Sequence, residues 1–340
     1  MRLLSALKAK DLKNKICLLR LDFNTEDNWR MLASVPTIKF LAKYCKAVVI
    51  LSHRGRPKGF ERDLSLRPLR KVLSKMLKRN VVFMPHFRFL EIKNLVREAS
   101  GGTVFLLENL RFLEGEAENN RILAEHLAML GDFYANDAFA VSHRANASVA
   151  AITKFLPSYA GLELEAEIKN LSKVIKNPKK PLVIILGGLK IKDKMAVYKN
   201  LKEKASAFLI GGALTPATLR LKLSKVIWPV DSKRNGEGVI RDIGLNSEKL
   251  FSKEIAKAKT IIWNGPLGDI GQKQFKSGTK AIAKAIVGNK KAFKIIGGGE
   301  TVMFLKKMKL DKKINFISTG GGAMLDFLAG KKLPGIEALK

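Results

Sequence analysis

The chain has 340 residues, too many for one ordinary hydrophobic core, so we expect two domains. Its 63 Lys and Arg residues outnumber its 30 Asp and Glu residues, which gives a formal net charge of +33 and indicates attraction to polyanions and phosphorylated metabolites. Both halves of the chain are basic, and this argues against a detachable nucleic-acid-binding tail.

Short apolar runs rich in Val and Ile alternate with longer, lysine-rich segments of helical pattern, which is typical of βαβ units and parallel sheets. These runs are residues 16–23, 47–51, 81–84, 104–107 and 133–135 in the first half, and residues 182–186, 207–210, 260–263, 293–296 and 315–317 in the second. Because none alternates polar with apolar residues, each is predicted to be a strand covered on both faces. We therefore predict an α/β fold with two Rossmann-like, doubly wound parallel-sheet domains.

A domain boundary is predicted between residues 157 and 180. The segment LPSYAG (156–161) interrupts the alternation, LELEAEIKNLSKVIK (162–176) has the pattern of one long helix, and NPKKP (177–181) restarts the chain. We predict an N-terminal domain over residues 1–160, a hinge helix over residues 161–177 and a C-terminal domain that begins at residue 178.

The predicted strands of the first half end in the polar and cationic loops "DFN", "SHRGRP", "ENLRF" and "NDAFAVSHRANAS". Each loop alone also fits a solvated turn in a basic protein, and Arg111 also fits a structural salt bridge to Glu108. Together, however, the loops bring Arg30, Arg56, Arg111 and Arg144 to one edge of the sheet, where ligands of such folds bind. Since arginine is a planar, permanently charged fork for carboxylate and phosphate, this edge is predicted to hold an anion.

The predicted strands of the second half lead to glycine, in "LGGLK", "IGGA", "NGP", "GGGET" and "STGGGA". Neither GxxxxGK[ST] nor GxGxxG occurs, and a single glycine cluster is common in turns. Five clusters after five strands indicate an edge at which backbone N–H groups approach a phosphate.

The two cysteines, Cys17 and Cys45, lie in apolar runs without metal-ligand or redox spacing, and we expect buried thiols in a reducing compartment. No apolar run approaches the ~20 residues of a membrane-spanning helix, and the N-terminus lacks the pattern of a signal peptide. We expect a cytoplasmic protein without membrane contact.

Nine motifs together resemble those of the phosphoglycerate kinase family, and the resemblance runs almost from end to end. They are "RLDFN", "SHRGRPKG", "LLENLRF", "NDAFAVSHRANAS", "LGGLKIKDK", "IIWNGPLG", "IIGGGET", "STGGGA" and "LPGIEAL". The resemblance implies reversible phosphoryl transfer from 1,3-bisphosphoglycerate to ADP, giving 3-phosphoglycerate and ATP, with Mg²⁺ as cofactor. It implies a monomer in which residues 178–325 bind the nucleotide, residues 326–340 return to the acid-binding N-terminal domain, and domain closure precedes direct in-line transfer.

The resemblance also implies roles for individual residues. The acid-binding set would be Asp22, Asn24, Arg30, His53, Arg56, Arg111 and Arg144. The nucleotide-binding set would be Gly187, Gly188, Lys190, Lys194, Gly211, Asn264, Pro266, Gly298, Gly299, Glu300 and Thr301, with Glu300 on the side of the metal. The catalytic set would be Arg30, Lys190, Gly320 and Gly321.

Four features depart from the family pattern. The loop before Arg30 is shortened. Gly271 stands where the family has a glutamate that receives the ribose, which predicts weakened nucleotide affinity unless Asp269 serves instead. Glu300 replaces an aspartate, and Asn146 replaces the second histidine of "HRAHAS".

The high charge supports a second hypothesis, a weakened family member that binds nucleic acid non-specifically. Aromatic residues make up only 7% of the chain, and it has no groove-reading motif, so the enzyme is the preferred interpretation.

Overall fold

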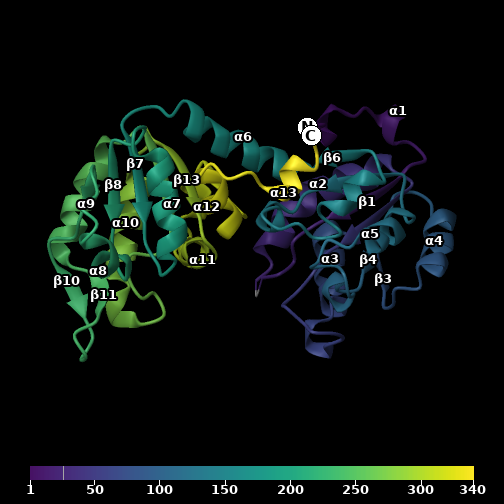
Figure 1. Cartoon of the computed structure of the whole chain (residues 1–340), viewed down its shortest axis with the longest axis horizontal. Helices are drawn as coiled ribbons and strands as arrows, with labels where there is room; N and C mark the ends of the chain where they lie inside the picture. The colour runs from purple at the N-terminus through teal and green to yellow at the C-terminus, as the bar shows by residue number, and fades with distance from the viewer. Residues whose placement is uncertain (26) are drawn as a thin grey trace. The chain divides into compact units, whose positions relative to one another are not determined.

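The computed structural model describes residues 1–25 and 27–340. Within them the chain forms two compact units (Figure 1). Unit 1 comprises Met1–Glu167 and Lys332–Lys340, and unit 2 comprises Ile168–Lys331. Each is built on a six-stranded sheet whose neighbouring strands are all parallel, which confirms the predicted fold class.

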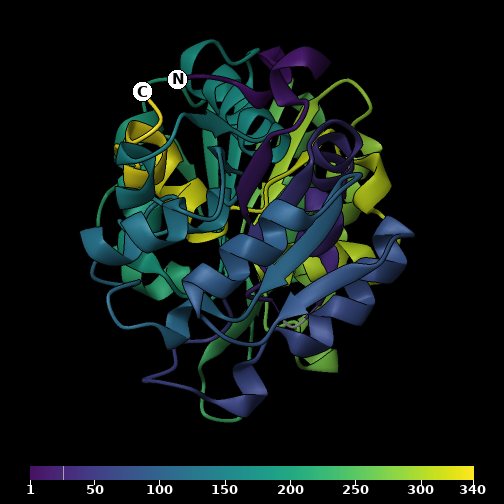
Figure 2. The same cartoon turned by 90° about the vertical axis from the view of Figure 1, so that its right-hand side faces the viewer.

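The sheet of unit 1 has the strand order β3-β4-β2-β1-β5-β6. Figure 2 shows the strands of this unit in purple, blue and teal. Its strands are β1 (Ile16–Arg20), β2 (Ala47–Leu51), β3 (Val81–Met84), β4 (Thr103–Leu107), β5 (Phe133–Asn136) and β6 (Ser158–Ala160). Its helices are α1 (Ala9–Leu12), α2 (Trp29–Tyr44), α3 (Arg67–Leu77), α4 (Phe89–Glu98), α5 (Arg121–Ala128) and α13 (Pro334–Glu337), with the 3-10 turns η1 (Leu4–Ala6), η2 (Arg62–Leu64), η3 (Leu110–Phe112), η4 (Phe139–Val141) and η5 (Ala151–Lys154). Every residue of β1 and β2 is buried, as expected for strands covered on both faces.

Apart from one-residue differences at an end of β4 and of β5, two details of this sheet differ from the prediction. The first strand ends at Arg20 and not at Phe23, because the backbone turns there: Phe23 donates to the Ser52 hydroxyl and Asn24 to the Asp22 carboxylate. Residues 158–160, predicted to interrupt the pattern, instead form the edge strand β6 beside β5. A strand of three residues is too short to show a period.

The sheet of unit 2 has the strand order β14-β13-β12-β7-β8-β9. Its strands are β7 (Leu182–Leu186), β8 (Ala207–Ile210), β9 (Val226–Ile227), β12 (Thr260–Asn264), β13 (Phe293–Gly297) and β14 (Phe316–Ile317). Its helices are α7 (Ile191–Leu201), α8 (Leu214–Leu219), α9 (Leu245–Lys257), α10 (Ser277–Gly288), α11 (Gly299–Lys307) and α12 (Gly322–Leu328), with η6 (Lys273–Phe275) and η7 (Asp311–Lys313). A separate antiparallel hairpin, β10 (Ser232–Arg234) with β11 (Ile240–Ile243), was not predicted.

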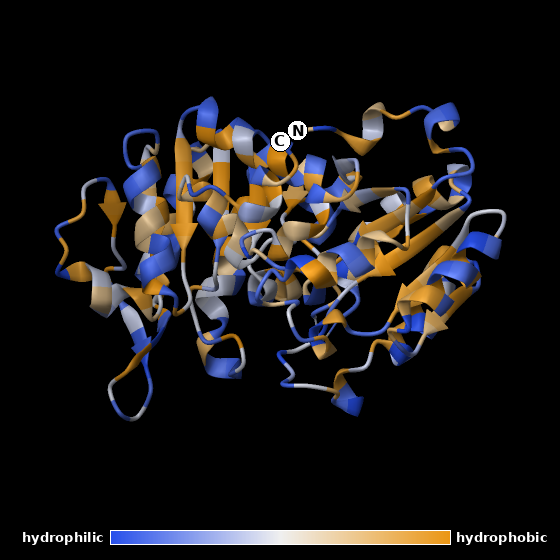
Figure 3. Cartoon of the chain, turned by 45° about the vertical axis from the view of Figure 1, so that its right-hand side comes forward, coloured by the Kyte–Doolittle hydropathy of each residue, from blue (hydrophilic) through white to orange (hydrophobic). Residues whose placement is uncertain are grey.

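Each unit has its own hydrophobic core, built from the strands and the inner faces of the helices (Figure 3). In unit 1, Leu19 and Ile50 pack with Ile38 of α2. In unit 2, Ile185 and Trp263 pack in the same core as Phe251 and Ile282. These cores fix the strand ends at which the loops of both units begin.

The long helix α6 (Leu162–Lys176) crosses the division between the units. Its first turn is bound to unit 1, because the Asp137 carboxylate accepts from the N–H groups of Glu163 (2.8 Å) and Leu164 (3.0 Å). Unit 1 therefore extends to residue 167, beyond the predicted domain end at residue 160.

The returning segment begins at Lys332, later than the predicted residue 326. Helix α12 packs on α7, and Asn200 of α7 donates to the Leu328 carbonyl at 2.8 Å, which keeps residues 326–331 in unit 2. The final nine residues complete unit 1, where Gly335 N–H donates to the Ser142 carbonyl at 2.8 Å.

Across residues 1–25 and 27–340, no helix combines the length and the apolar character that crossing a membrane requires.

Candidate active site

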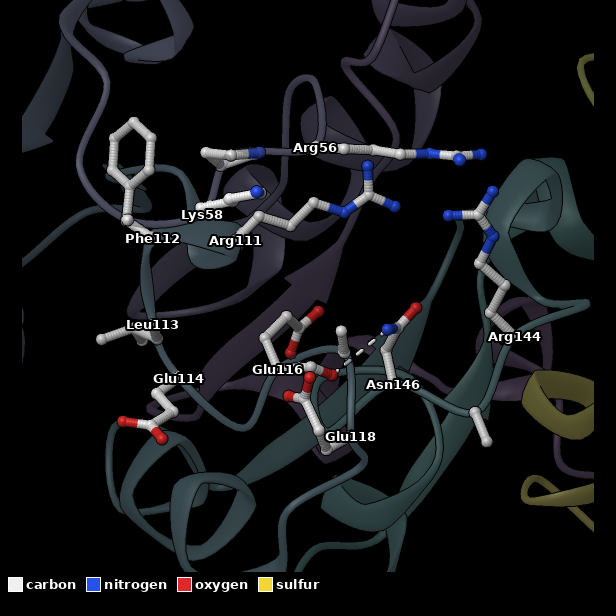
Figure 4. Close-up of a pocket in the computed structure, with 14 residues that line it drawn as sticks. Arg56, Lys58, Arg111, Phe112, Leu113, Glu114, Glu116, Glu118, Arg144 and Asn146 are labelled. Atoms are coloured by element: carbon white, nitrogen blue, oxygen red, sulfur yellow. Dashed lines mark hydrogen bonds between the residues drawn. The ribbon is translucent and has the colours of Figure 1, made fainter.

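Three arginines converge on one pocket at the carboxyl edge of the unit 1 sheet. Arg56 follows β2, Arg111 lies in η3 after β4, and Arg144 follows η4 after β5. Their guanidinium groups gather at one end of a pocket of about 910 Å³ (Figure 4). Parallel strands end at the same edge, and this explains how loops far apart in sequence deliver these charges to one place.

The guanidinium group of Arg111 is held in place by the loop after β2. This group donates to the Gly55 carbonyl. The backbone N–H of Arg111 donates to the Asn109 side chain at 3.1 Å. Burial first, and then the nearby charges of Arg144 and Arg20, lower the pKa of Arg111 to about 10.

Within the described residues, Arg111 does not form the alternative salt bridge to Glu108. The Glu108 carboxylate instead accepts from the Ser65 hydroxyl at 2.6 Å and from Leu66 N–H at 2.8 Å. Arg111 therefore directs its positive charge to the pocket.

The loop after β1 carries a second polar group of the same edge. Asp22 is buried and binds Arg30 of α2 with 3.1 Å between Oδ2 and Nη1. Its other oxygen, Oδ1, lies 3.9 Å from Nε2 of His53. The Asn24 side chain accepts from Gly55 N–H at 2.8 Å, which ties this loop to the loop after β2. Despite the shortened loop, Arg30 therefore reaches the carboxyl edge.

The polar groups beneath this edge were not predicted from the sequence. Arg20, the last residue of β1, is 1% exposed and donates from Nε to the Ser148 hydroxyl at 2.8 Å. Glu116 is equally buried, accepts from the same hydroxyl at 2.6 Å, and lies 3.6 Å from Nη2 of Arg20. Burial raises the pKa of Glu116. An arginine inside an apolar run was a signal that could have revealed Arg20, whereas nothing in the sequence pairs it with Glu116.

The glycine loops of unit 2 meet at the carboxyl edge of its sheet. After β7, Gly187 N–H donates to the Asn264 carbonyl at 3.1 Å, and Gly188 N–H donates to the Pro266 carbonyl at 2.9 Å. A Cβ atom on Gly187 would lie 2.0 Å from the Pro266 carbonyl oxygen, so no larger residue fits between the two loops. Glycine is required here by close backbone approach.

Two lysines flank this edge at the start of α7. Lys190 is exposed at the N-cap position, and Lys194 is 3% exposed in the first turn. The Lys194 ammonium lies near Gly188, since a Cβ atom there would be 3.6 Å from Nζ. Burial first, and then the charge of Lys190, lower the pKa of Lys194 to about 8.

The other predicted nucleotide residues surround the ends of β8, β13 and β14. Gly298, with φ +92°, precedes α11, and Gly299 and Glu300 are exposed in its first turn. Thr301 is buried, and its hydroxyl accepts from Gly265 N–H at 3.1 Å. Gly211 follows β8, and Gly320 and Gly321 stand between β14 and α12.

Comparisons with known proteins agree over the whole chain. The phosphoglycerate kinase family model matches residues 7–226 and 218–331. The phosphoglycerate kinase of Thermosipho africanus is 39% identical over an alignment of 385 positions, gaps included, which covers 97% of this chain and 96% of the relative. That of Dictyoglomus turgidum is 36% identical over an alignment of 386 positions, with 98% of each chain covered. The chain belongs to the phosphoglycerate kinase family.

Solved phosphoglycerate kinase structures share the fold. The structure from Coxiella burnetii has a TM-score of 0.84 at 32% identity, with 99% of this chain and 98% of that chain covered. The structure from Pyrococcus horikoshii OT3 has a TM-score of 0.90 at 28% identity, with 100% and 98% covered.

Membership of the phosphoglycerate kinase family makes this chain an enzyme, a phosphotransferase with a carboxyl group as acceptor. Its reaction is the reversible transfer of a phosphoryl group from 1,3-bisphosphoglycerate to ADP, a step of glycolysis. The comparisons give no support to the alternative of a weakened, nucleic-acid-binding relative.

The structure shows the contacts made at two positions that depart from the family pattern, Gly271 and Asn146. Gly271 is exposed, and its N–H donates to Asp269 at 3.2 Å. Asp269 is already engaged, because its carboxylate lies 3.7 Å from Arg241 and accepts from Gln272 at 2.8 Å. Asn146 lines the arginine pocket and donates to the Glu116 carbonyl at 3.2 Å.

Proposed function

We propose that unit 1 binds 3-phosphoglycerate and that the phosphate group of this substrate enters the pocket formed by Arg56, Arg111 and Arg144. The observation that carries this proposal is the convergence of three guanidinium groups on one pocket (Figure 4). Bidentate guanidinium–phosphate hydrogen bonds are strong and directional, so three such groups select a dianionic phosphate over a neutral ligand.

Asp22, Asn24 and His53 would bind the rest of the acid, and Arg30 would contact the transferring phosphoryl group. Asp22 supports this arrangement, because its carboxylate holds the Arg30 guanidinium at 3.1 Å. A fixed fork next to the reacting acyl phosphate stabilises charge on the equatorial oxygens of the moving group.

Unit 2 would bind ADP or ATP along its glycine edge. Gly298 and Gly299 leave the backbone open to phosphate. Gly187, Gly188, Gly211, Asn264, Pro266 and Thr301 shape the loops beside them. Lys190 and Lys194 bring positive charge to the same edge. The loop of Gly320 and Gly321 would direct its N–H groups at the transferring phosphoryl group.

Magnesium fits this site only together with the nucleotide. Among the described residues, no group of three or more His, Cys, Asp or Glu side chains is arranged to hold a metal. Mg²⁺ typically takes one or two carboxylates and completes its shell with phosphates and water, and the exposed Glu300 carboxylate suits that role. When bound, the ion would neutralise phosphate charge.

Transfer needs no covalent nucleophile, since alignment and charge stabilisation are sufficient for phosphoryl transfer. The acid and the nucleotide would bind to different units, so direct in-line transfer requires the units to bring the two substrates together. Such closure also excludes water, which would otherwise hydrolyse the acyl phosphate.

We further propose that the enzyme works as a monomer in the cytoplasm. Cys17 and Cys45 are both free and buried, which suits a reducing compartment. Any contact with nucleic acid would be non-specific and driven by the +33 charge, and would disappear as salt rises. Size-exclusion chromatography with light scattering tests the monomer: a stable dimer at micromolar concentration would contradict it.

A coupled assay of ADP-dependent consumption of 1,3-bisphosphoglycerate, with and without Mg²⁺, tests the proposal. Arg111→Met and Arg144→Met should each raise KM for 3-phosphoglycerate in the reverse reaction at least tenfold and leave KM for ATP nearly unchanged. Arg70→Met, at an exposed position of α3, is the matched control and should change neither constant. If the two pocket variants keep the normal KM for the acid, the arginine pocket is not the acid site.

A further inference from the structure

Arg20 lies under the proposed acid site without lining the arginine pocket. It ends β1, is 1% exposed, and is held from below by the Ser148 hydroxyl at 2.8 Å and by the Glu116 carboxylate at 3.6 Å. Nη1 donates to the Leu21 carbonyl at 2.5 Å. Both terminal nitrogens also face one ring nitrogen, since Nη1 lies 3.3 Å and Nη2 lies 3.2 Å from Nδ1 of His53.

These contacts decide the protonation of His53. Because guanidinium groups only donate, Nδ1 of His53 must accept, and the single proton of the neutral ring lies on Nε2. If the ring were doubly protonated, its Nδ1–H group would face the N–H groups of both Nη1 and Nη2 of Arg20. The groups facing His53 are the carboxylate of Asp22 and the four cations Arg20, Arg30, Arg111 and Arg144. Burial first, and then these cations, hold the pKa of His53 well below its usual range.

The Nε2–H group of His53 is left without a hydrogen-bond partner within residues 1–25 and 27–340, although it is buried. Oδ1 of Asp22 is 3.9 Å from this nitrogen, beyond hydrogen-bond length. An unsatisfied buried donor is unfavourable, so this group stands ready for an acceptor oxygen. The other oxygen of Asp22 holds Arg30.

We propose that Arg20 is a positioning residue for the kinase reaction: it fixes His53 in the neutral tautomer that carries its proton on Nε2 and presents this N–H group to an oxygen of the acid substrate. The inference rests on the proposed place of His53 in the acid-binding set. Glu116 and Ser148 orient Arg20, so the unit 1 acid site has a layer of buried support.

If Arg20 served only as one half of a buried ion pair, its loss would lower the stability of the fold without changing the tautomer of His53. Removing Arg20 alone would leave the Glu116 charge buried without its partner and would destabilise the fold whichever role is correct. The double variant Arg20→Met/Glu116→Gln removes both charges together and keeps the side-chain volumes similar. Urea unfolding establishes that this variant is folded before its other properties are measured.

Nitrogen-15 NMR of the histidine rings reads the tautomer directly in the free enzyme. The His53 signals are assigned by their absence from His53→Gln. In the wild type we expect one neutral tautomer, protonated at Nε2, between about pH 5.5 and 8. In the double variant we expect a mixture of both neutral tautomers, because burial and the three remaining arginines still hold the pKa of His53 low. A wild-type His53 that titrates near pH 6.5, or a double variant that keeps the single tautomer, would overturn the inference.

Kinetics provide the second measurement. The double variant should raise KM for 3-phosphoglycerate about tenfold with kcat and KM for ATP nearly unchanged. Arg97→Met, which breaks a unit 1 ion pair with Asp132 (2.9 Å), is the control and should leave KM unchanged.

His53→Gln separates the two proposals. If it leaves KM for the acid unchanged, His53 does not bind the substrate and the proposed function loses this residue. If His53→Gln raises KM but the double variant does not, His53 binds the acid and the role given to Arg20 is wrong.

Discussion

Replacing Lys194 by methionine should stabilise unit 2 and weaken nucleotide binding at the same time. The Lys194 side chain is 3% exposed, and burial lowers its pKa from 10.5 to about 8. The charged form of Lys194 is therefore less stable in the folded protein than in the unfolded chain. We expect the negative charge of the nucleotide phosphates to stabilise it when the nucleotide binds.

The pKa gives the size of the effect. At about 1.36 kcal/mol for each pKa unit, lowering from 10.5 to about 8 corresponds to about 3 kcal/mol of stability lost at pH 7. Between pH 8 and 10.5 only the folded state has lost the proton, so the stability of the wild type rises with pH across this window. The advantage of Lys194→Met should be about 3 kcal/mol at pH 7 and should vanish above pH 10.5.

Urea unfolding at pH 7 and pH 9.5 measures the stability, and calorimetric titration with ADP measures the affinity. We expect Lys194→Met to bind ADP at least tenfold more weakly at pH 7, and the affinity of the wild type to fall as pH rises through about 8. Lys192→Met, at an exposed position of the same helix, should change neither quantity. A variant that is less stable than the wild type at pH 7, or that binds ADP normally, would refute this reasoning.

Three further predictions concern single positions. Arg30→Ala should lower kcat about a hundredfold or more with little change in the Kd for ADP, and retained turnover in the coupled assay would show that Arg30 does not contact the moving group. Gly271→Glu should tighten ADP binding, since its new Cβ would meet only Asp269 at 3.3 Å; an unchanged titration would count against a lost ribose contact. Thr301→Val should lower the unfolding free energy by about 1–3 kcal/mol, because Gly265 N–H loses its acceptor; equal urea midpoints would contradict this.

The strands buried on both faces could be predicted from the sequence. The runs that became β2 and β7 match their strands residue for residue, because each is a short apolar run bounded by polar or turn residues. The hairpin of β10 and β11 was missed because its strands carry charged residues such as Lys233 and Asp242. The turn dipeptide at Asn235 and Gly236 was the available signal.

The candidate site was predictable only in its outer part. Arg56, Arg111 and Arg144 stand in loops after predicted strands, and the parallel topology brings them together. The support beneath them was not predictable, because the contact between Arg20 and Glu116 joins residues 96 positions apart through side-chain packing alone. The division of the units at Glu167 likewise depends on the Asp137 cap, a contact that no local pattern records.

The path of the chain also sets the order of assembly during synthesis. Unit 2 is one continuous segment, whereas unit 1 lacks Lys332–Lys340 until the ribosome has made all of unit 2. The first unit to be translated is therefore the last to be finished. Because Gly335 closes this unit through Ser142 and Asn136, a released chain truncated before Gly335 would carry a complete unit 2 and an incomplete unit 1 open to proteases.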